Sequence, residues 1–281
     1  MKLAVITDSS VYIPEHFADR DNLFILDIEV SIENTAYIEG KNLTLAAFYQ
    51  KMAASKELPK TSQPSLAALD TLLTQLEEEH YTHAVGLFLS GGISGFHQNI
   101  QYLIEEHHKL QLAFPDTKIT SSPMGWMVME VLKWAKEDLP FEQILSQLQI
   151  LIDKTNAFIM VDDLNHLVKG GRLSNGSALL GTLLNIKPIL YFNDGKIEVF
   201  EKVRTEKKAI KRLIAALDEV TADGSYMTYI IHANVKDKAE YLKGLLEEHG
   251  YTDNLMVVPF NSIIATHLGE GAIAVGAVPK I

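Results

Sequence analysis

The chain contains no cysteine, and this absence removes several classes of chemistry at once. Without thiols the protein can have neither a disulfide framework, nor a thiolate nucleophile, nor a cysteine-ligated zinc site. Basic side chains are also few, since 25 Lys and Arg stand against 36 Asp and Glu, which gives a formal net charge of -11. An excess of acidic groups disfavours a broad polyanion-binding surface, so we expect no nucleic acid partner.

Long apolar runs are absent as well. No segment approaches the roughly 20 apolar residues that span a bilayer, and the first apolar run ends before Asp8, too early for the core of a signal peptide. We therefore expect a cytoplasmic protein. The sequence has no Gly-x-x-x-x-Gly-Lys-Ser phosphate loop, no dinucleotide fingerprint and no His-Glu-x-x-His spacing, so no cofactor and no metal ion are implied.

The 281 residues, 47% hydrophobic and 22% charged, are typical of a soluble globular protein and enough for two domains. In the first half, strand-like apolar segments alternate with helical patterns, which predicts a parallel sheet with helices on both faces. The expected strands cover residues 3–6, 23–30, 84–89 and 118–122. The expected helices cover residues 43–54, 65–80, 96–108, 126–136 and 141–155.

A second region begins at Ala157. Asn193-Asp194-Gly195 lies between two strand-like segments and is a strong hairpin signal, so antiparallel pairing is expected here. The predicted strands are 184–190, 196–203, 227–232 and 255–260, and the predicted helices are 162–174, 206–218 and 236–249. We thus predict an α/β protein of two domains, an α/β/α parallel-sheet domain (1–156) and a two-layer α/β domain with a mixed sheet (157–281). Neither a helix nor a strand is predicted for the Gly- and Ala-rich residues 261–279.

Four clusters of small polar residues are placed where strands end or helices begin: residues 7–10, 61–65, 90–95 and 121–125. Parallel strands bring such turns to one edge of a sheet, where ligands bind. Free backbone N–H groups and helix N-termini favour an anion there. Glycines that turn the chain and serines that cap helices would account for the clusters equally well.

Ser94 lies in Gly-Ile-Ser-Gly-Phe, one glycine short of the nucleophile elbow of esterases. With Asp162 or Asp163 and His267 following in chain order, a lipid esterase or thioesterase triad can be drawn. A serine and a histidine that only bind a ligand need no strained elbow. His267 could also be a core histidine satisfied by carbonyl groups, and the polar turns alone would also suit a sugar or phosphate binder.

Residues 202–208 together with Lys211 and Arg212 form the one basic concentration in this acidic chain. An ordinary charged helix surface explains it. The alternative is a docking site for an acidic partner or a lipid headgroup.

Several separated segments match one family pattern in order along nearly the whole chain. They are Thr7-Asp8-Ser9-Ser10, Thr61-Ser62-Gln63-Pro64, Leu89-Ser90 with Ser94-Gly95 and Gln98-Asn99, Leu164 with Leu167 and Gly170-Gly171-Arg172, Asn185 to Pro188 with Asp194-Gly195, Val203-Arg204, and Thr266-His267 with Gly269 and Gly271. In these segments the chain resembles the DegV family, the fatty-acid-binding subunits of bacterial fatty acid kinase.

The resemblance implies a long-chain fatty acid in an apolar tunnel between two α/β domains. Its carboxylate would be bound by Thr61, Ser94 and His267, with Ser62 nearby. A separate ATP-dependent kinase would phosphorylate the acid, so this chain would be a non-catalytic subunit, with Arg172 and Arg204 facing the partner. A monomer is expected, with room for transient contact with a membrane surface.

The chain departs from the family pattern at three positions. Phe96 stands where threonine is usual, His97 where tyrosine is common, and Glu270 where the family has proline. A bulky Phe96 would affect the preference for chain length. Because an inward carboxylate would repel a fatty acid headgroup, we expect Glu270 to point to solvent.

Overall fold

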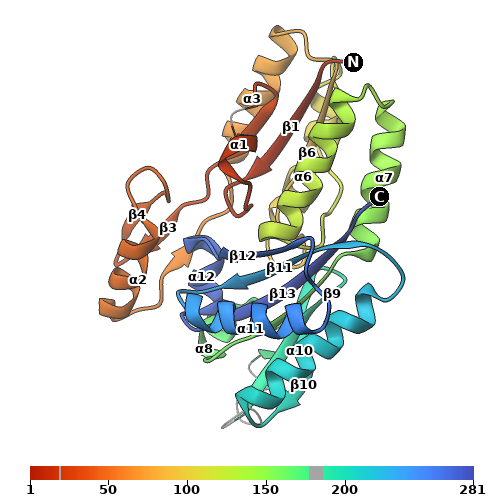
Figure 1. Ribbon diagram of the computed structural model, residues 1–281. Helices are drawn as coiled ribbons and strands as arrows, with labels where there is room; N and C mark the ends of the chain where they lie inside the picture. Colours follow the sequence, from red (N-terminus) through yellow and green to blue (C-terminus); the bar gives the residue numbers. More distant parts are fainter. Residues whose placement is uncertain (19, 177–185) are drawn as a thin grey trace.

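The computed structural model describes residues 1–18, 20–176 and 186–281, which form two α/β halves (Figure 1). The first half contains a four-stranded, fully parallel sheet in the order β2-β1-β6-β7. Its strands are β1 (Leu3–Asp8), β2 (Leu23–Leu26), β6 (His83–Leu87) and β7 (Gln111–Ala113). Its helices are α1 (Glu15–Ala18), α3 (Leu66–Glu78), α4 (Phe96–Asn99), α5 (Leu103–Glu106), α6 (Ser121–Lys136) and α7 (Phe141–Lys154).

Strand β1 is buried along its whole length because helices cover both faces of this sheet. Ala4 and Ile6 belong to the cluster that contains Leu69 and Leu73 of α3. Leu3 and Val5, which point the other way, belong to the cluster that contains Met127 and other residues of α6. The predicted α/β/α arrangement of the first half is therefore confirmed.

A small arm projects from the first half (Figure 1). It consists of the antiparallel sheet β4-β3-β5 and helix α2. Its elements are β3 (Val30–Ile32), β4 (Thr35–Tyr37), β5 (Lys60–Thr61) and α2 (Leu45–Ala54). The single strand predicted for residues 23–30 is thus wrong, since the chain leaves the parallel sheet after Leu26 and pairs again only in the arm. This detour positions Thr61 away from the parallel sheet.

The second half contains a six-stranded mixed sheet in the order β10-β9-β8-β13-β11-β12, as predicted in type. Neighbouring strands are antiparallel except β11 and β12. The strands are β8 (Asn156–Met160), β9 (Lys187–Asn193), β10 (Lys196–Val203), β11 (Tyr226–His232), β12 (Leu255–Pro259) and β13 (Ile273–Pro279). The helices are α8 (Asn165–Lys169), α10 (Glu206–Thr221), α11 (Lys236–Glu248) and α12 (Ser262–Leu268). The predicted domain boundary coincides with the start of β8 and stays a prediction.

The predicted hairpin at residues 193–195 is confirmed. Asp194 and Gly195 have φ values of 46° and 79°, as the two central residues of a type I′ turn require, and join β9 to β10. Residues 184 and 185 of the strand predicted before it lie outside the described residues.

Other element predictions need correction. Residues 118–122 are not a strand, because Thr117 Oγ1 donates to the carbonyls of Phe88 and Ile119, and Ser121 already begins α6. The helix predicted for 96–108 is two short helices. The helix predicted for 162–174 is only α8, since the chain turns at Gly170 and at Gly171, which has a φ of 71°. The unassigned residues 261–279 contain α12 and the sheet-central strand β13.

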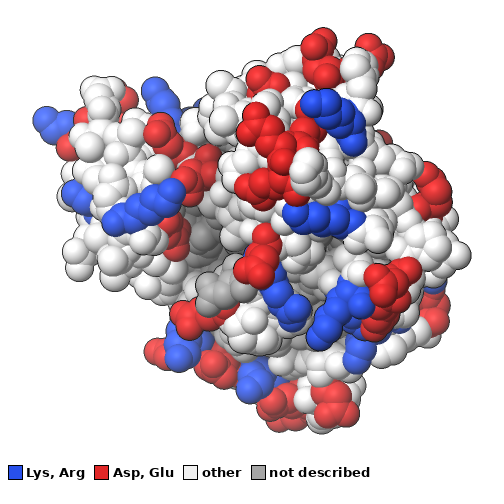
Figure 2. Space-filling view, turned by 90° about the horizontal axis from the view of Figure 1, so that it is seen from above, with Lys and Arg blue, Asp and Glu red and all other residues white. Residues whose placement is uncertain are grey.

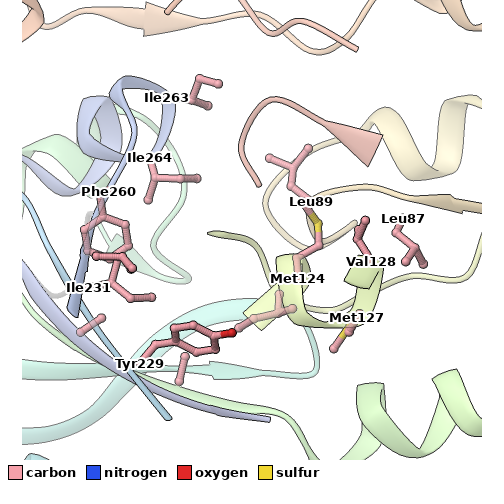
Figure 3. Close-up of a cluster of buried hydrophobic side chains, with 14 of the residues drawn as sticks. Leu87, Leu89, Met124, Met127, Val128, Tyr229, Ile231, Phe260, Ile263 and Ile264 are labelled. Atoms are coloured by element: carbon pink, nitrogen blue, oxygen red, sulfur yellow. The ribbon is translucent and has the colours of Figure 1, made fainter. Parts of the chain in front are cut away.

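The two halves share one continuous core, seen in Figure 3. Leu89, Met124 and Val128 from the first half lie in the same buried cluster as Tyr229 and Ile231 of β11. The inner face of the mixed sheet therefore packs on the α6 side of the first half, while α10 and α11 contribute to a separate cluster on its outer face. No helix within the described residues is long and apolar enough to cross a membrane.

Candidate ligand-binding site

A cavity lies between the two halves, where the space between atoms amounts to about 740 Å³ when the part open to solvent is included. Most of its wall is apolar and comes from both halves. The apolar lining residues are Ile28, Leu89, Ile93, Ile119, Pro123, Ala157, Ile159, Leu167, Phe192, Ile197, Ile231, Phe260, Ile263, Ile264, Leu268 and Ala274. The polar lining residues are Thr61, Ser62, Ser94, Thr120, Ser121, Arg172 and His267.

Thr61 and His267 meet at the boundary between this cavity and a more polar, open pocket outside it. Thr61 Oγ1 and His267 Nε2 form a hydrogen bond of 2.7 Å, which joins β5 of the arm to α12. Asn261 fixes α12 at its start, because its Oδ1 accepts from Ile264 N and its Nδ2 donates to the carbonyl of Ser9. A Cβ at Gly170 would lie 2.8 Å from His267 Nδ1, so only glycine allows the chain to pass this close to the ring.

His267 is held as a neutral imidazole. Burial, as the largest cause, acts together with the positive charge of Arg172 and the nearby His166 to lower its pKa to about 4. A neutral imidazole has one N–H donor and one acceptor nitrogen. The Thr61–His267 pair can therefore offer a single neutral donor to a polar group at the mouth of the cavity.

Ser94 and Ser62 add two hydroxyl groups to the lining of the cavity. Ser94 Oγ accepts from Phe96 N at 3.3 Å, and Ser62 Oγ accepts from Glu29 N at 3.1 Å. Because each hydroxyl oxygen serves as an acceptor, its own hydrogen is free to be donated elsewhere. The four residues predicted to bind a carboxylate thus line one cavity, although they come from three separate parts of the chain.

The turn that carries Ser94 is clamped by the β9–β10 hairpin of the other half. Ser90 Oγ donates to the carbonyl of Gly195 at 2.7 Å, and Lys118 Nζ lies 2.6 Å from Asp194 Oδ1. A Cβ at Gly92 would be only 2.2 Å from the same Gly195 carbonyl oxygen. The position of Ser94 consequently depends on how the two halves meet.

Arg172 and Arg204, predicted together as partner-facing, lie in different places. Arg172 is half-buried, lines both the cavity and the outer pocket, and donates to the carbonyls of Ile93 and Gly170. Burial lowers its pKa, and no carboxylate among the described residues forms an ion pair with it. Arg204 is exposed in a separate groove that also includes Lys208 and Lys211.

The outer pocket is lined by charged residues of both signs: basic Lys56, Lys60 and Lys169, and acidic Glu57 and Glu270. On the face shown in Figure 2, acidic and basic side chains are likewise interspersed. Among residues 1–18, 20–176 and 186–281, no group of three His, Asp or Glu side chains is placed to hold a metal ion.

The esterase triad is not assembled in the described structure. His267 Nε2 is bonded to Thr61, whereas a triad requires this histidine to reach the serine on one side and a carboxylate on the other. Asp162 pairs with Lys187, and Asp163 accepts from the backbone of Asn165.

The structure shows where two of the residues that depart from the family pattern, Phe96 and Glu270, are located. Phe96 is fully buried and packs edge-on against Phe88 at 4.9 Å between ring centroids, and it is not among the residues that line the cavity. Glu270 is exposed and accepts from Asn234 Nδ2, so the expectation that it points to solvent is confirmed.

The sequence predicts the polar clusters but does not show which of them line the cavity and which only stabilise the fold. Residues 7–10 are largely internal structure, since Asp8 accepts from Leu89 N and Ser10 N, and Thr7 donates to the carbonyl of Leu87. Ser121, noted only as part of such a cluster, lines the cavity, as does Thr120. The apolar wall has no local sequence signal, because most of it comes from residues far apart in sequence.

These features define an α/β protein with a mostly apolar interdomain cavity that ends in neutral hydrogen-bond donors. Such a cavity suits a ligand with a long apolar body and a small polar end. The DegV family model, described as "Uncharacterised protein, DegV family", matches residues 2–280. The chain therefore belongs to the DegV family.

Similar proteins agree in length and fold. A DegV domain-containing protein of Streptococcus pyogenes is 60% identical over 282 residues, with all of both chains covered. A crystal structure described as a fatty acid binding DegV family protein from Streptococcus agalactiae is 59% identical, with a TM-score of 0.98 and full coverage of both chains. DegV from Bacillus subtilis, described as a fatty acid binding protein, is 32% identical with a TM-score of 0.90, again with full coverage.

Proposed function

We propose that this protein binds one long-chain fatty acid, with the acyl chain in the interdomain cavity and the carboxylate at Thr61, Ser62, Ser94 and His267. The observation that carries the proposal is the Thr61–His267 pair at the mouth of an apolar cavity. The fatty acid binding described for the Streptococcus agalactiae and Bacillus subtilis proteins supports it.

Both the polar groups and the apolar wall of the site favour a fatty acid as the ligand. A buried carboxylate without partners is costly, and the hydroxyl and imidazole groups can donate to its oxygens. Each buried methylene contributes about 0.8 kcal/mol, so a sixteen-carbon chain has roughly 12 kcal/mol of gross burial energy before ordering costs. Affinity would come mainly from the chain, while the polar residues fix which end lies at the mouth.

The first test is mass spectrometry of protein purified under native conditions and then denatured in organic solvent. We expect stoichiometric release of a long-chain fatty acid. Thr61→Val should lower affinity for the acid by about tenfold, because one hydrogen bond to a charged group is lost. Thr35→Val, on an exposed strand of the same small sheet, is the matched control. Release of a sugar or a phosphorylated compound would overturn the proposal.

We further propose that the protein is a non-catalytic subunit that presents the carboxylate to a separate ATP-dependent kinase, which forms an acyl phosphate. The family resemblance supports this role, and so does the open polar pocket outside Thr61 and His267, through which a partner could approach the headgroup. A cytoplasmic, monomeric carrier with transient contact with a membrane surface is consistent with such delivery.

The presentation role predicts a separation of binding from phosphorylation. With a bacterial fatty acid kinase subunit and ATP, Arg204→Ala should slow acyl phosphate formation severalfold and leave fatty acid affinity unchanged, because Arg204 lies outside the cavity. Lys136→Ala, another exposed basic residue, is the control. Acyl phosphate formation by this protein alone, or hydrolysis of an acyl thioester that Ser94→Ala abolishes, would contradict the role.

A further inference from the structure

The start of helix α6 places hydroxyl groups in the wall of the cavity. Thr120, Ser121 and Ser122 are all buried, with Ser121 only 2% exposed and Ser122 fully buried. Thr120 Oγ1 is hydrogen-bonded to Ser10 Oγ at 2.8 Å. Ser121 Oγ and Ser122 Oγ have no hydrogen-bond partner among the described residues. Two unpaired hydroxyls side by side in a core are unusual, because such groups are nearly always satisfied.

Ser121 and Ser122 differ in their relation to the cavity. Ser121 lines the cavity, whereas Ser122 is not among the lining residues. Ser121 also has a φ of 58°, in the left-handed region, and forms an isolated bridge with Val11. The unpaired Ser121 hydroxyl therefore borders the space that a ligand would fill.

The surroundings of Ser121 favour an acceptor oxygen. Helix α6 is sixteen residues long, and Thr120, at its N-cap, makes no side-chain capping bond. The positive end of the helix and the free hydroxyl hydrogen both attract a lone pair. A charged group is disfavoured, because the neighbouring wall residues Ile119 and Pro123 are apolar.

We propose that Thr120 and Ser121 form an inner polar subsite that binds a neutral oxygen carried on the acyl chain, such as an in-chain hydroxyl or keto group. This inference rests on the proposed function, since it requires the acyl chain to occupy the cavity. With the carboxylate fixed at Thr61 and His267, Ser121 lies opposite a limited stretch of the chain. The protein therefore discriminates among oxygenated fatty acids by the position of the oxygen.

The experiment measures the affinity of delipidated protein for stearate and for a series of hydroxystearates that differ in the carbon bearing the hydroxyl. We expect wild-type protein to bind isomers with the hydroxyl at one or a few adjacent carbons about fivefold or more tighter than the other isomers, which corresponds to one hydrogen bond. Ser121→Ala should abolish this preference and leave stearate affinity equal or higher. Ser122→Ala is the matched control and should retain it.

A second variant guards against misfolding of the first. Ser121→Gly also removes the hydroxyl and accepts the positive φ without strain, so it should behave like Ser121→Ala. Affinity independent of hydroxyl position, or a positional preference that survives in both Ser121 variants, would overturn the subsite. Failure to bind stearate itself would instead overturn the proposed function, so the two failures are distinguishable.

Discussion

At the scale of single residues, His267 shows how burial sets the chemistry of the mouth. A protonated imidazole would bind a carboxylate more strongly but would have to be buried beside Arg172 when no ligand is present. The neutral ring avoids that repulsion and still hydrogen-bonds Thr61. Arg172 is then the permanent positive charge beside the mouth.

The lowered pKa of His267 predicts a dependence of stability on pH. The ring titrates at about 4 in the folded protein and near 6.5 in the unfolded chain, so between these values the unfolded chain binds the proton more readily. The contribution of His267 is complete above pH 6.5 and is lost as the pH falls toward 4. Relative to His267→Gln, lipid-free wild-type protein should lose at most about 3 kcal/mol over this range.

Urea unfolding of both proteins at several pH values measures the difference. Because other groups titrate in both proteins alike, the comparison isolates residue 267. Parallel pH profiles would show that the histidine is not held neutral.

Asp8 is a second buried residue with a defined task. Its two carboxylate oxygens accept from Ser10 N and Leu89 N, which ties the ends of β1 and β6 together, and burial raises its pKa. In Asp8→Asn the amide nitrogen would face one of these N–H donors. We expect a loss of about 1–3 kcal/mol in the free energy of unfolding.

Denaturant titration near neutral pH tests the Asp8 prediction. Asp21→Asn, at a position outside the buried core of the same half, is the control and should change stability little. Equal stability of Asp8→Asn and wild-type protein would mean that the two backbone bonds are dispensable.

At the scale of elements, the β9–β10 hairpin fixes the turn that carries Ser94. The close approach of Gly92 to the Gly195 carbonyl predicts that Gly92→Ala pushes the hairpin away and costs about 1–3 kcal/mol of stability. Fatty acid affinity should fall as well, because Ser94 follows two residues later. Gly95→Ala in the same turn, where an added Cβ would meet only Asn99 Nδ2 at 3.7 Å, should leave both unchanged.

Thermal unfolding and fatty acid titration of the two glycine variants give the comparison. If Gly92→Ala and Gly95→Ala lose affinity equally, the turn tolerates no change anywhere and the hairpin contact has no special role.

The elements also show what could be predicted from the sequence. Local signals sufficed where they are strong, since residues 193–195 form the expected hairpin. Local signals failed where tertiary pairing decides. Residues 118–122 contain the β-branched Ile119 and Thr120 that strands favour, yet the Ile119 carbonyl accepts from Ser90 N, beyond the end of β6, and these residues form no strand. The small residues of β13 form a strand because β8 and β11 flank them.

Some features of the candidate site can likewise be predicted from the sequence, and others arise only from packing. Thr61, Ser62, Ser94 and His267 could be named beforehand from the family resemblance, and the structure brings them to one cavity. The hydrogen bond between Thr61 and His267, 206 residues apart, and the unpaired Ser121 hydroxyl arise from packing and have no local signature.

At the scale of the whole molecule, the shared core and the cavity between the halves couple ligand binding to global stability. A long-chain fatty acid at about 100 times its Kd should stabilise the protein by roughly 2.7 kcal/mol. Because the proposed ligand would contact both halves, we expect one unfolding transition that moves up by about 5 °C or more. The methyl ester of the same acid, which lacks the carboxylate, should give a smaller shift.

Differential scanning calorimetry distinguishes the outcomes. Two transitions, of which the ligand moves only one, would show that the acid binds within one half and not between them.

The central place of β13 bears on how the protein is made. β13 is the last strand of the mixed sheet in sequence, yet it lies between β8 and β11 and pairs with both. While a ribosome is still synthesising residues before 273, β8 and β11 have no partner between them, and their facing edges are exposed. The mixed sheet, and with it the cavity between the halves, is complete only after β13 has emerged. The strands of the first half all precede residue 114 and therefore leave the ribosome earlier.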